Sequence, residues 1–170
     1  MLIIDTKPLL TPIKICSPYD GGIDREKWNR DPDTYLIDVI SSDEDIPLPP
    51  AKPGEKITVF DFAPLEYGAF EHLEHMIRKT TYEHWYNDPE IQQHAIRYSL
   101  VDLHNAHIKT DYGTRPISVQ REETSLGRRI TAESWREISP FADSGTWAML
   151  CLACAILSRK RSKTTVESAG

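Results

Sequence analysis

The stretch over residues 66–109 most constrains how this chain can fold, because it has the pattern of two amphipathic helices joined by a tight turn. In its first half, apolar side chains such as Leu73 and Ile77 recur at steps of three and four residues, which places them on one face of a helix. In its second half, Asp88 can accept from free N–H groups and Pro89 suits the first helical position. The sequence therefore predicts a helical hairpin core over 66–109.

The second predicted helix has two apolar faces and is expected to end by Tyr112-Gly113. One layer of neighbours cannot cover both faces. The helix therefore either lies in the middle of a small domain or offers its second face to another chain. The residues that we expect at an interface are Ile91, Tyr98, Val101 and Ile108 on this face, with Trp28, Tyr35 and Ile37 nearer the N-terminus.

Residues 1–64 differ in composition from the rest of the chain. They hold nine of the twelve prolines, and their charged groups are seven basic and twelve acidic. Such a composition disfavours a compact core. Short apolar runs that fit strands interrupt it, at 2–4, 9–10, 13–15, 35–40 and 57–62, and the acidic 41–45 run leads into a proline-rich connector. We expect a long extended N-terminal arm with short strand segments.

The C-terminal region contains an uninterrupted apolar run over 147–157, followed by basic residues. At about 1.5 Å per residue this run spans roughly half of a bilayer's hydrocarbon core, so a buried helix over 146–159 is favoured over membrane insertion. Small side chains recur along it, which permits close approach to another helix. Upstream, 115–120 and 129–131 fit a hairpin around Gly127, and Thr131 is expected to cap a short helix.

These elements predict a mainly α fold with minor β, of the α+β class. Residues 1–64 would form the arm, 65–160 a helical core domain and 161–170 a flexible tail. A chain of 170 residues is long enough to bury one hydrophobic core.

All six histidines lie in the predicted hairpin. If the two predicted helices are antiparallel, some of these histidines would lie beside carboxylates of the other helix. Metal sites in helix bundles are assembled in this way. The candidate ligands are Glu71, His72, His75, Asp102, His104 and His107. The carboxylate-bridged Glu-x-x-His pair and the His-x-x-x-His pair are both missing, so solvated or interfacial histidines are the favoured interpretation. Histidines at an interface would weaken association on acidification as they gain charge.

Composition and motifs narrow the remaining function classes. The net charge of −6 argues against nucleic-acid binding. Three cysteines are too few for a disulfide framework, and Cys151 and Cys154 fall mid-helix among apolar residues, which favours core packing over redox chemistry. No secretory leader, nucleophile elbow or glycine-rich phosphate loop is found. We expect no cofactor, no small-molecule substrate and no membrane, and a location in the cytoplasm or in a particle assembled there.

The favoured function is a non-enzymatic structural or assembly subunit whose N-terminal arm packs on neighbouring protein subunits of the same or another kind. A virion head, connector or tail accessory protein is one concrete form, by analogy of architecture. The first alternative is a small metal-binding protein or enzyme that uses the histidine-rich hairpin. A second is a regulator whose acidic 41–45 segment mimics nucleic acid or binds a basic partner, with tight, salt-sensitive association.

Overall fold

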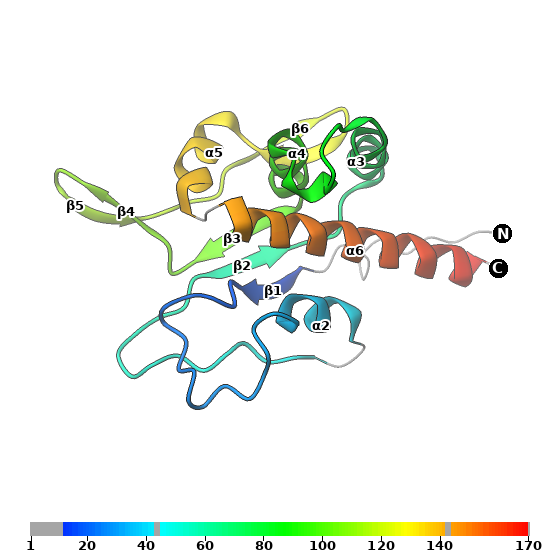
Figure 1. Ribbon diagram of the computed structural model, residues 1–170. Helices are drawn as coiled ribbons and strands as arrows, with labels where there is room; N and C mark the ends of the chain where they lie inside the picture. Colours follow the sequence, from blue (N-terminus) through cyan, green and yellow to red (C-terminus); the bar gives the residue numbers. More distant parts are fainter. Residues whose placement is uncertain (1–11, 43–44, 142–143, 170) are drawn as a thin grey trace.

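The computed structural model describes residues 12–42, 45–141 and 144–169, the last nine of these by backbone path alone. A long C-terminal helix, α6 (Ser144–Ala169), runs through the middle of the molecule. A three-stranded sheet and helix α2 (Tyr35–Ser41) lie on one side of it, and helices α3 and α4 on the other (Figure 1).

The central sheet is antiparallel, with the strands in the order β1 (Ile13–Cys16), β2 (Val59–Phe62) and β3 (Leu100–His104). Ile15, Phe60 and Leu103 are cross-strand partners, and all three are buried. The ring of Phe60 meets Trp147 of α6 edge to face at 6.1 Å. Alternation along the strands thus turns one face of the sheet toward α6.

Helix α6 separates two hydrophobic clusters. Trp147 and Leu150 belong to the cluster built on the sheet, whereas Cys151, Cys154 and Ala155 belong to the cluster with α3 and α4. A helix that is apolar all round must be covered on all sides, and this position meets that requirement. The small side chains allow close packing on α4, as the sequence predicted.

Helices α3 (Tyr67–Lys79) and α4 (Pro89–Ser99) pack against each other and are linked through a short 3-10 turn, η1 (Trp85–Asn87). Asp88 caps α4 as expected, because its side chain accepts from the Glu90 N–H at 3.0 Å. Its other oxygen accepts from Thr80 Oγ1 at 2.7 Å, which ties the end of α3 to the start of α4.

Two β-hairpins and a short helix follow the sheet. The first hairpin pairs β4 (His107–Thr110) with β5 (Gly113–Pro116), and the second pairs β6 (Arg121–Thr124) with β7 (Gly127–Ile130). Helix α5 (Ala132–Ile138) begins after Thr131, whose side chain accepts from the Ser134 N–H, and a 3-10 turn, η2 (Ser139–Phe141), follows it. The cap at Thr131 is confirmed. The predicted hairpin exists around Gly127, but its first strand is 121–124 rather than 115–120.

The α+β class is correct, but the expected helical hairpin core over 66–109 is wrong. The second helix ends at Ser99, and the chain continues as strand β3 and then as β4. The reason is non-local, since β3 pairs with β2 and alternates buried Leu103 with outward Asp102 and His104. The two apolar faces of α4 are covered within the chain, where Ile91 and Ile96 are fully buried.

The long extended N-terminal arm is also wrong. Strands β1 and β2 lie in the central sheet, and residues 35–40, expected as a strand, form most of helix α2. Ile15, Tyr35 and Phe62 are among the most deeply buried side chains of the protein. These short apolar runs pack in the core despite the polar average composition of the region. An isolated β-bridge between Ile23 and Ala51 joins two of its segments. The runs at 2–4 and 9–10 lie outside the described residues.

The expected apolar helix over 146–159 is present within α6, which begins at Ser144 and continues to Ala169. Within the described residues no single helix is both long and apolar enough to cross a membrane. A pair bent by 117°, Ala132–Phe141 with Gly145–Lys160, passes that test by length and composition alone.

Candidate functional site

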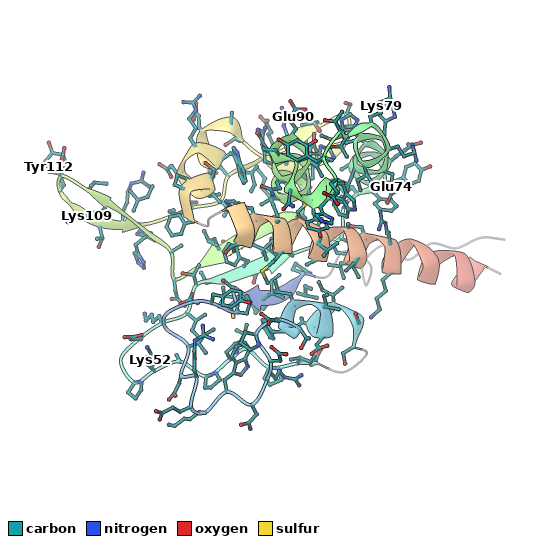
Figure 2. All side chains as sticks on the ribbon, viewed as in Figure 1. Lys52, Glu74, Lys79, Glu90, Lys109 and Tyr112 are labelled. Atoms are coloured by element: carbon teal, nitrogen blue, oxygen red, sulfur yellow. The ribbon has the colours of Figure 1, made fainter. Side chains whose placement is uncertain are left out.

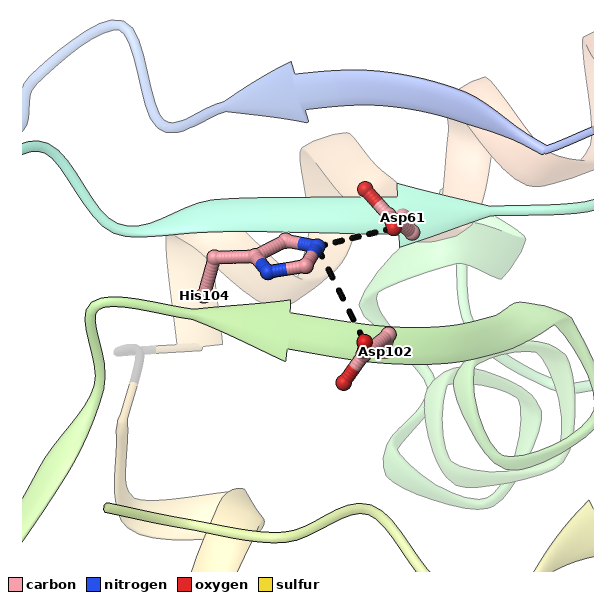
Figure 3. A group of neighbouring side chains, drawn as sticks. All are labelled: Asp61, Asp102 and His104. Atoms are coloured by element: carbon pink, nitrogen blue, oxygen red, sulfur yellow. Dashed lines mark hydrogen bonds and ion pairs between the residues drawn. The ribbon is translucent and has the colours of Figure 1, made fainter.

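A group of charged side chains occupies the face of the central sheet that points away from the Phe60 side. Lys14 of β1, Asp61 of β2 and Asp102 of β3 are successive cross-strand partners, and His104 is two residues beyond Asp102 on the same face. Figure 3 shows the two carboxylates and the imidazole converging. The sheet therefore places four groups from three strands side by side, which the sequence positions alone do not suggest.

The distances within this group are short. Lys14 Nζ donates to the two carboxylate oxygens of Asp61 at 3.1 and 3.2 Å. His104 Nε2 lies 2.9 Å from Asp61 Oδ2 and 3.8 Å from Asp102 Oδ2. The side chain of Asp61 is 14% exposed, against 53% for Asp102 and 40% for His104. Asp61 is thus the least exposed of the three, and the other two side chains are open to solvent.

Two of the six ligand candidates from the sequence, Asp102 and His104, meet in this group. Glu71, His72 and His75 lie exposed on α3, and His107 lies exposed on β4. Among the described residues, Asp61, Asp102 and His104 are the one set of three or more potential ligands whose atoms lie within 4.8 Å of one another. Sequence reasoning missed Asp61, although the alternation in Val59-Phe60-Asp61-Phe62 marks it as the outward residue of a strand.

His94 is the histidine most tightly held between helices. Its Nε2 is 2.9 Å from the carbonyl oxygen of Ala69 on α3, so an N–H there donates across the α3–α4 contact. Its ring packs on His72 at 4.9 Å and on Tyr98 at 4.7 Å. Burial lowers the pKa of His94 below its ordinary value, despite the opposing effect of the Ala69 hydrogen bond. This histidine therefore packs α4 against α3.

The cysteines are structural. Cys16, Cys151 and Cys154 are buried and form no disulfide. The thiols of Cys151 and Cys154 lie 3.9 and 3.8 Å from the carbonyl oxygens of Ile91 and Ala95 on α4. Burial raises the pKa of Cys151 and raises that of Cys16 to about 11. Thiols with raised pKa values in packed surroundings are poor nucleophiles, so the Cys-x-x-Cys pattern reflects close helix packing.

The β4–β5 hairpin projects from the body of the molecule (Figure 1). Tyr112 at its tip is fully exposed, at 101%, and every residue of β5 is exposed. Figure 2 shows Lys109 and Tyr112 far from the other labelled side chains. In the described chain the two strands pair with each other alone, so each keeps one open edge. Unpaired strand edges present free N–H and C=O groups to any chain that can align with them.

The base of this hairpin is fixed to the body. Ala106 and Ile117 are buried and joined by a backbone hydrogen bond of 2.9 Å. Asn105 takes a positive φ of 58° and donates its amide to the carbonyl oxygen of Ile57 at 3.0 Å. Arg115 forms an ion pair with Glu137 of α5. The hairpin is therefore held in one direction by its base and by α5.

The residues expected at an interface fall into two groups. Tyr35, Ile91 and Tyr98 are buried in the chain's own core. The partly or fully accessible ones are Trp28, Ile37, Val101 and Ile108. Ile108 stands on the projecting hairpin and lines a cavity of about 470 Å³ with Phe141 and Pro140. Of the predicted set, Ile108 lies where a partner can reach both an apolar side chain and a strand edge.

A larger hollow lies beside the central sheet. It has a volume of about 540 Å³ and lies between β1, α2 and α6. Its walls are mainly apolar, with Ile13, Val39 and Leu157 among them, and no histidine or cysteine contributes to it. Lys14, Asp45 and Lys160 also line it, so charged groups border an otherwise largely apolar space.

Comparison of the chain with models of protein families, with characterised proteins and with solved structures finds no match. Its function is therefore inferred from the geometry of its own residues.

Proposed function

We propose that this protein is a non-enzymatic assembly subunit that binds another protein subunit through its β4–β5 hairpin. The observation that carries the proposal is the fully exposed Tyr112 at the tip of a ribbon with two open strand edges. A two-stranded ribbon is marginally stable by itself in water. A ribbon that a folded body holds out into solvent is suited to be completed by a partner.

The mode of binding that fits best is addition of a partner strand to the open edge of β5. Main-chain hydrogen bonds would supply the affinity, and alternate side chains would supply the specificity. Pro116 has no N–H to donate and lies at the body end of β5, so the donors on the open edge lie toward the tip. Tyr112 is a residue type that is enriched among binding hot spots, because it buries much area and loses little conformational entropy.

The fixed base supports the same proposal. Anchoring by the Ala106–Ile117 bond and the Arg115–Glu137 ion pair restricts the hairpin before binding, which reduces the entropy lost when a complex forms. Ile108 and the neighbouring cavity beside Phe141 offer apolar area at the foot of the hairpin. A partner that adds to the ribbon can also cover this area.

Two measurements test the proposal. Native mass spectrometry of the full chain reports self-association, and a Tyr112→Ala variant should reduce any oligomer to monomer if the partner is a second copy.

For a different partner, a photo-crosslinking amino acid is placed at position 112 in the cells that make the protein. A matched probe at position 67 serves as the control, because Tyr67 is 76% exposed but lies on α3. The proposal requires one of two results. Either the protein forms an oligomer that Tyr112→Ala converts to monomer, or the probe at position 112 forms one discrete crosslinked adduct that the probe at position 67 does not form. A monomer without such an adduct overturns it.

A further inference from the structure

Two carboxylates of like charge face each other across the central sheet. Asp61 of β2 and Asp102 of β3 are direct cross-strand partners on the face that does not pack on Trp147. Like charges directly opposite in a sheet are destabilising. Such a pair persists where a positive charge compensates it.

The protein's own cations compensate only one of the two. Lys14 reaches Asp61 and not Asp102. Within the described chain, Asp102 has His104 Nε2 at 3.8 Å as its side-chain partner, and its Oδ1 accepts from the N–H of Leu103 at 2.8 Å. Carboxylates therefore outnumber ammonium groups around the His104 ring, two to one. A divalent cation would reverse that imbalance.

We propose that Asp61, Asp102 and His104 bind one divalent first-row transition-metal ion, of the Zn²⁺ or Mn²⁺ type. Two carboxylate oxygens and one imidazole nitrogen form a mixed oxygen and nitrogen ligand set, which suits these ions better than Ca²⁺ or Mg²⁺. The site does not depend on the proposed function, because its ligands lie on the central sheet and outside the β4–β5 hairpin.

The geometry is close to what an ion requires. The three ligand atoms lie within 4.8 Å of one another. Two ligands of one tetrahedral zinc ion, each at about 2.1 Å, are separated by roughly 3.4 Å. His104 Nε2 lies 2.9 Å from Asp61 Oδ2 and 3.8 Å from Asp102 Oδ2, so each of these separations must change by about 0.5 Å, which rotation of the imidazole and of the exposed Asp102 side chain can supply. Three protein ligands leave at least one coordination position for water.

Lys14 contacts two of the three proposed ligands and would compete with an ion for them. Its Nζ is 3.5 Å from His104 Nε2 as well as 3.1 Å from Asp61 Oδ1. The lysine side chain is 59% exposed, so it can swing into solvent when an ion enters. An exposed lysine–carboxylate pair is weak and is readily displaced. Removal of the lysine amine should thus strengthen metal binding, an effect that a purely structural salt bridge does not produce.

The test is isothermal titration calorimetry of the full-length protein with ZnCl₂, MnCl₂ and CaCl₂ in metal-free buffer. One equivalent of Zn²⁺ or Mn²⁺ should bind, and Asp102→Asn and His104→Ala should each weaken that binding by at least about tenfold. The Lys14→Met variant should bind several-fold more tightly than the unchanged protein. The matched controls are Asp111→Asn and His107→Ala, an exposed carboxylate and an exposed imidazole on the β4–β5 hairpin, and they should bind as the unchanged protein does.

A spectroscopic readout accompanies the titration. Co²⁺ in place of Zn²⁺ should give d–d absorption bands that His104→Ala abolishes and His107→Ala retains. Circular dichroism of each variant confirms that it is folded. The proposal is overturned if neither ion binds at one equivalent below about 1 mM, or if His104→Ala binds as tightly as the unchanged protein. Equal loss in the His107→Ala control would also overturn it, because the ion would then be held by surface histidines.

Discussion

Gly127 lies against the carboxylate of Glu66, and the next residue, Arg128, donates its backbone N–H to that carboxylate at 2.5 Å. The turn of the β6–β7 hairpin is thereby fixed to the residue that precedes α3. The contact needs a residue without a side chain, since a Cβ at position 127 would overlap Glu66 Oε2. The φ of Gly127, +128°, is also one that L-residues rarely adopt.

Replacement of this glycine should therefore cost more than backbone strain alone. Gly127→Ala is expected to lower the free energy of unfolding by about 2–3 kcal/mol, measured by urea denaturation. Gly113→Ala is the matched control, because Gly113 has a φ of +120° but open space around it. It should cost about 1 kcal/mol. Equal losses in the two variants would contradict a role for the Glu66 contact.

The cap at Asp88 gives a second prediction. Asp88→Ala removes the acceptor for the Glu90 N–H and the partner of Thr80 Oγ1, so the free energy of unfolding should fall by about 1–2 kcal/mol. Asp88→Asn keeps a side-chain oxygen at the cap and should lose less than half of that. If Asn and Ala are equally destabilising, then the charge of Asp88 rather than its capping bond stabilises α4.

The features that could be predicted from the sequence are those that depend on near neighbours. The caps at Asp88 and Thr131 follow from side chains that bond to N–H groups two or three residues away. The segment Leu100–His104 fits both helical spacing and strand alternation, and its pairing with β2, far away in the chain, decides between them. The apolar run at 35–40 has the same ambiguity, and it forms a helix.

The same distinction explains the candidate site. Asp102 and His104 could be singled out from residue type and spacing, but Asp61 could not, because its place beside them depends on the register of two strands. That register is fixed by the apolar partners Phe60 and Leu103 on the other face. Packing on one side of the sheet thus sets the chemistry on the other.

The partly buried imidazole of His94 makes stability depend on pH. Burial lowers the pKa of His94 in the folded protein below 6.5. The nearby His72, Arg129 and Arg97 act in the same direction, and the Ala69 hydrogen bond acts against it. The unfolded chain then binds more protons than the folded one between these two pKa values. The free energy of unfolding should therefore decrease as the pH falls from 6.5 through the lowered pKa.

Urea denaturation at about pH 7 and about pH 5 measures this effect, and His94→Gln should reduce the difference between the two values. Glutamine can still donate to Ala69 but does not titrate. His75→Gln is the control, since His75 lies on α3 and is exposed. The prediction fails if both variants keep the full pH dependence.

The packing of α6 on α4 predicts the behaviour of the thiols. Cys16 and Cys151 are fully buried, Cys154 is 2% exposed, and burial raises the pKa values of Cys16 and Cys151. An aromatic disulfide reagent should therefore leave the native protein unmodified and react with all three thiols only after denaturation. Immediate reaction of Cys151 or Cys154 in the native protein would show that α6 opens from α4. Substitution of Cys151 tests how closely α4 and α6 approach each other. Cys151→Leu should lower the free energy of unfolding by about 1–3 kcal/mol, because the added volume meets the Ile91 backbone. Cys151→Ala should lower it by no more than about 1 kcal/mol. If leucine is accommodated without loss, α4 and α6 are not in the close contact that their small residues permit.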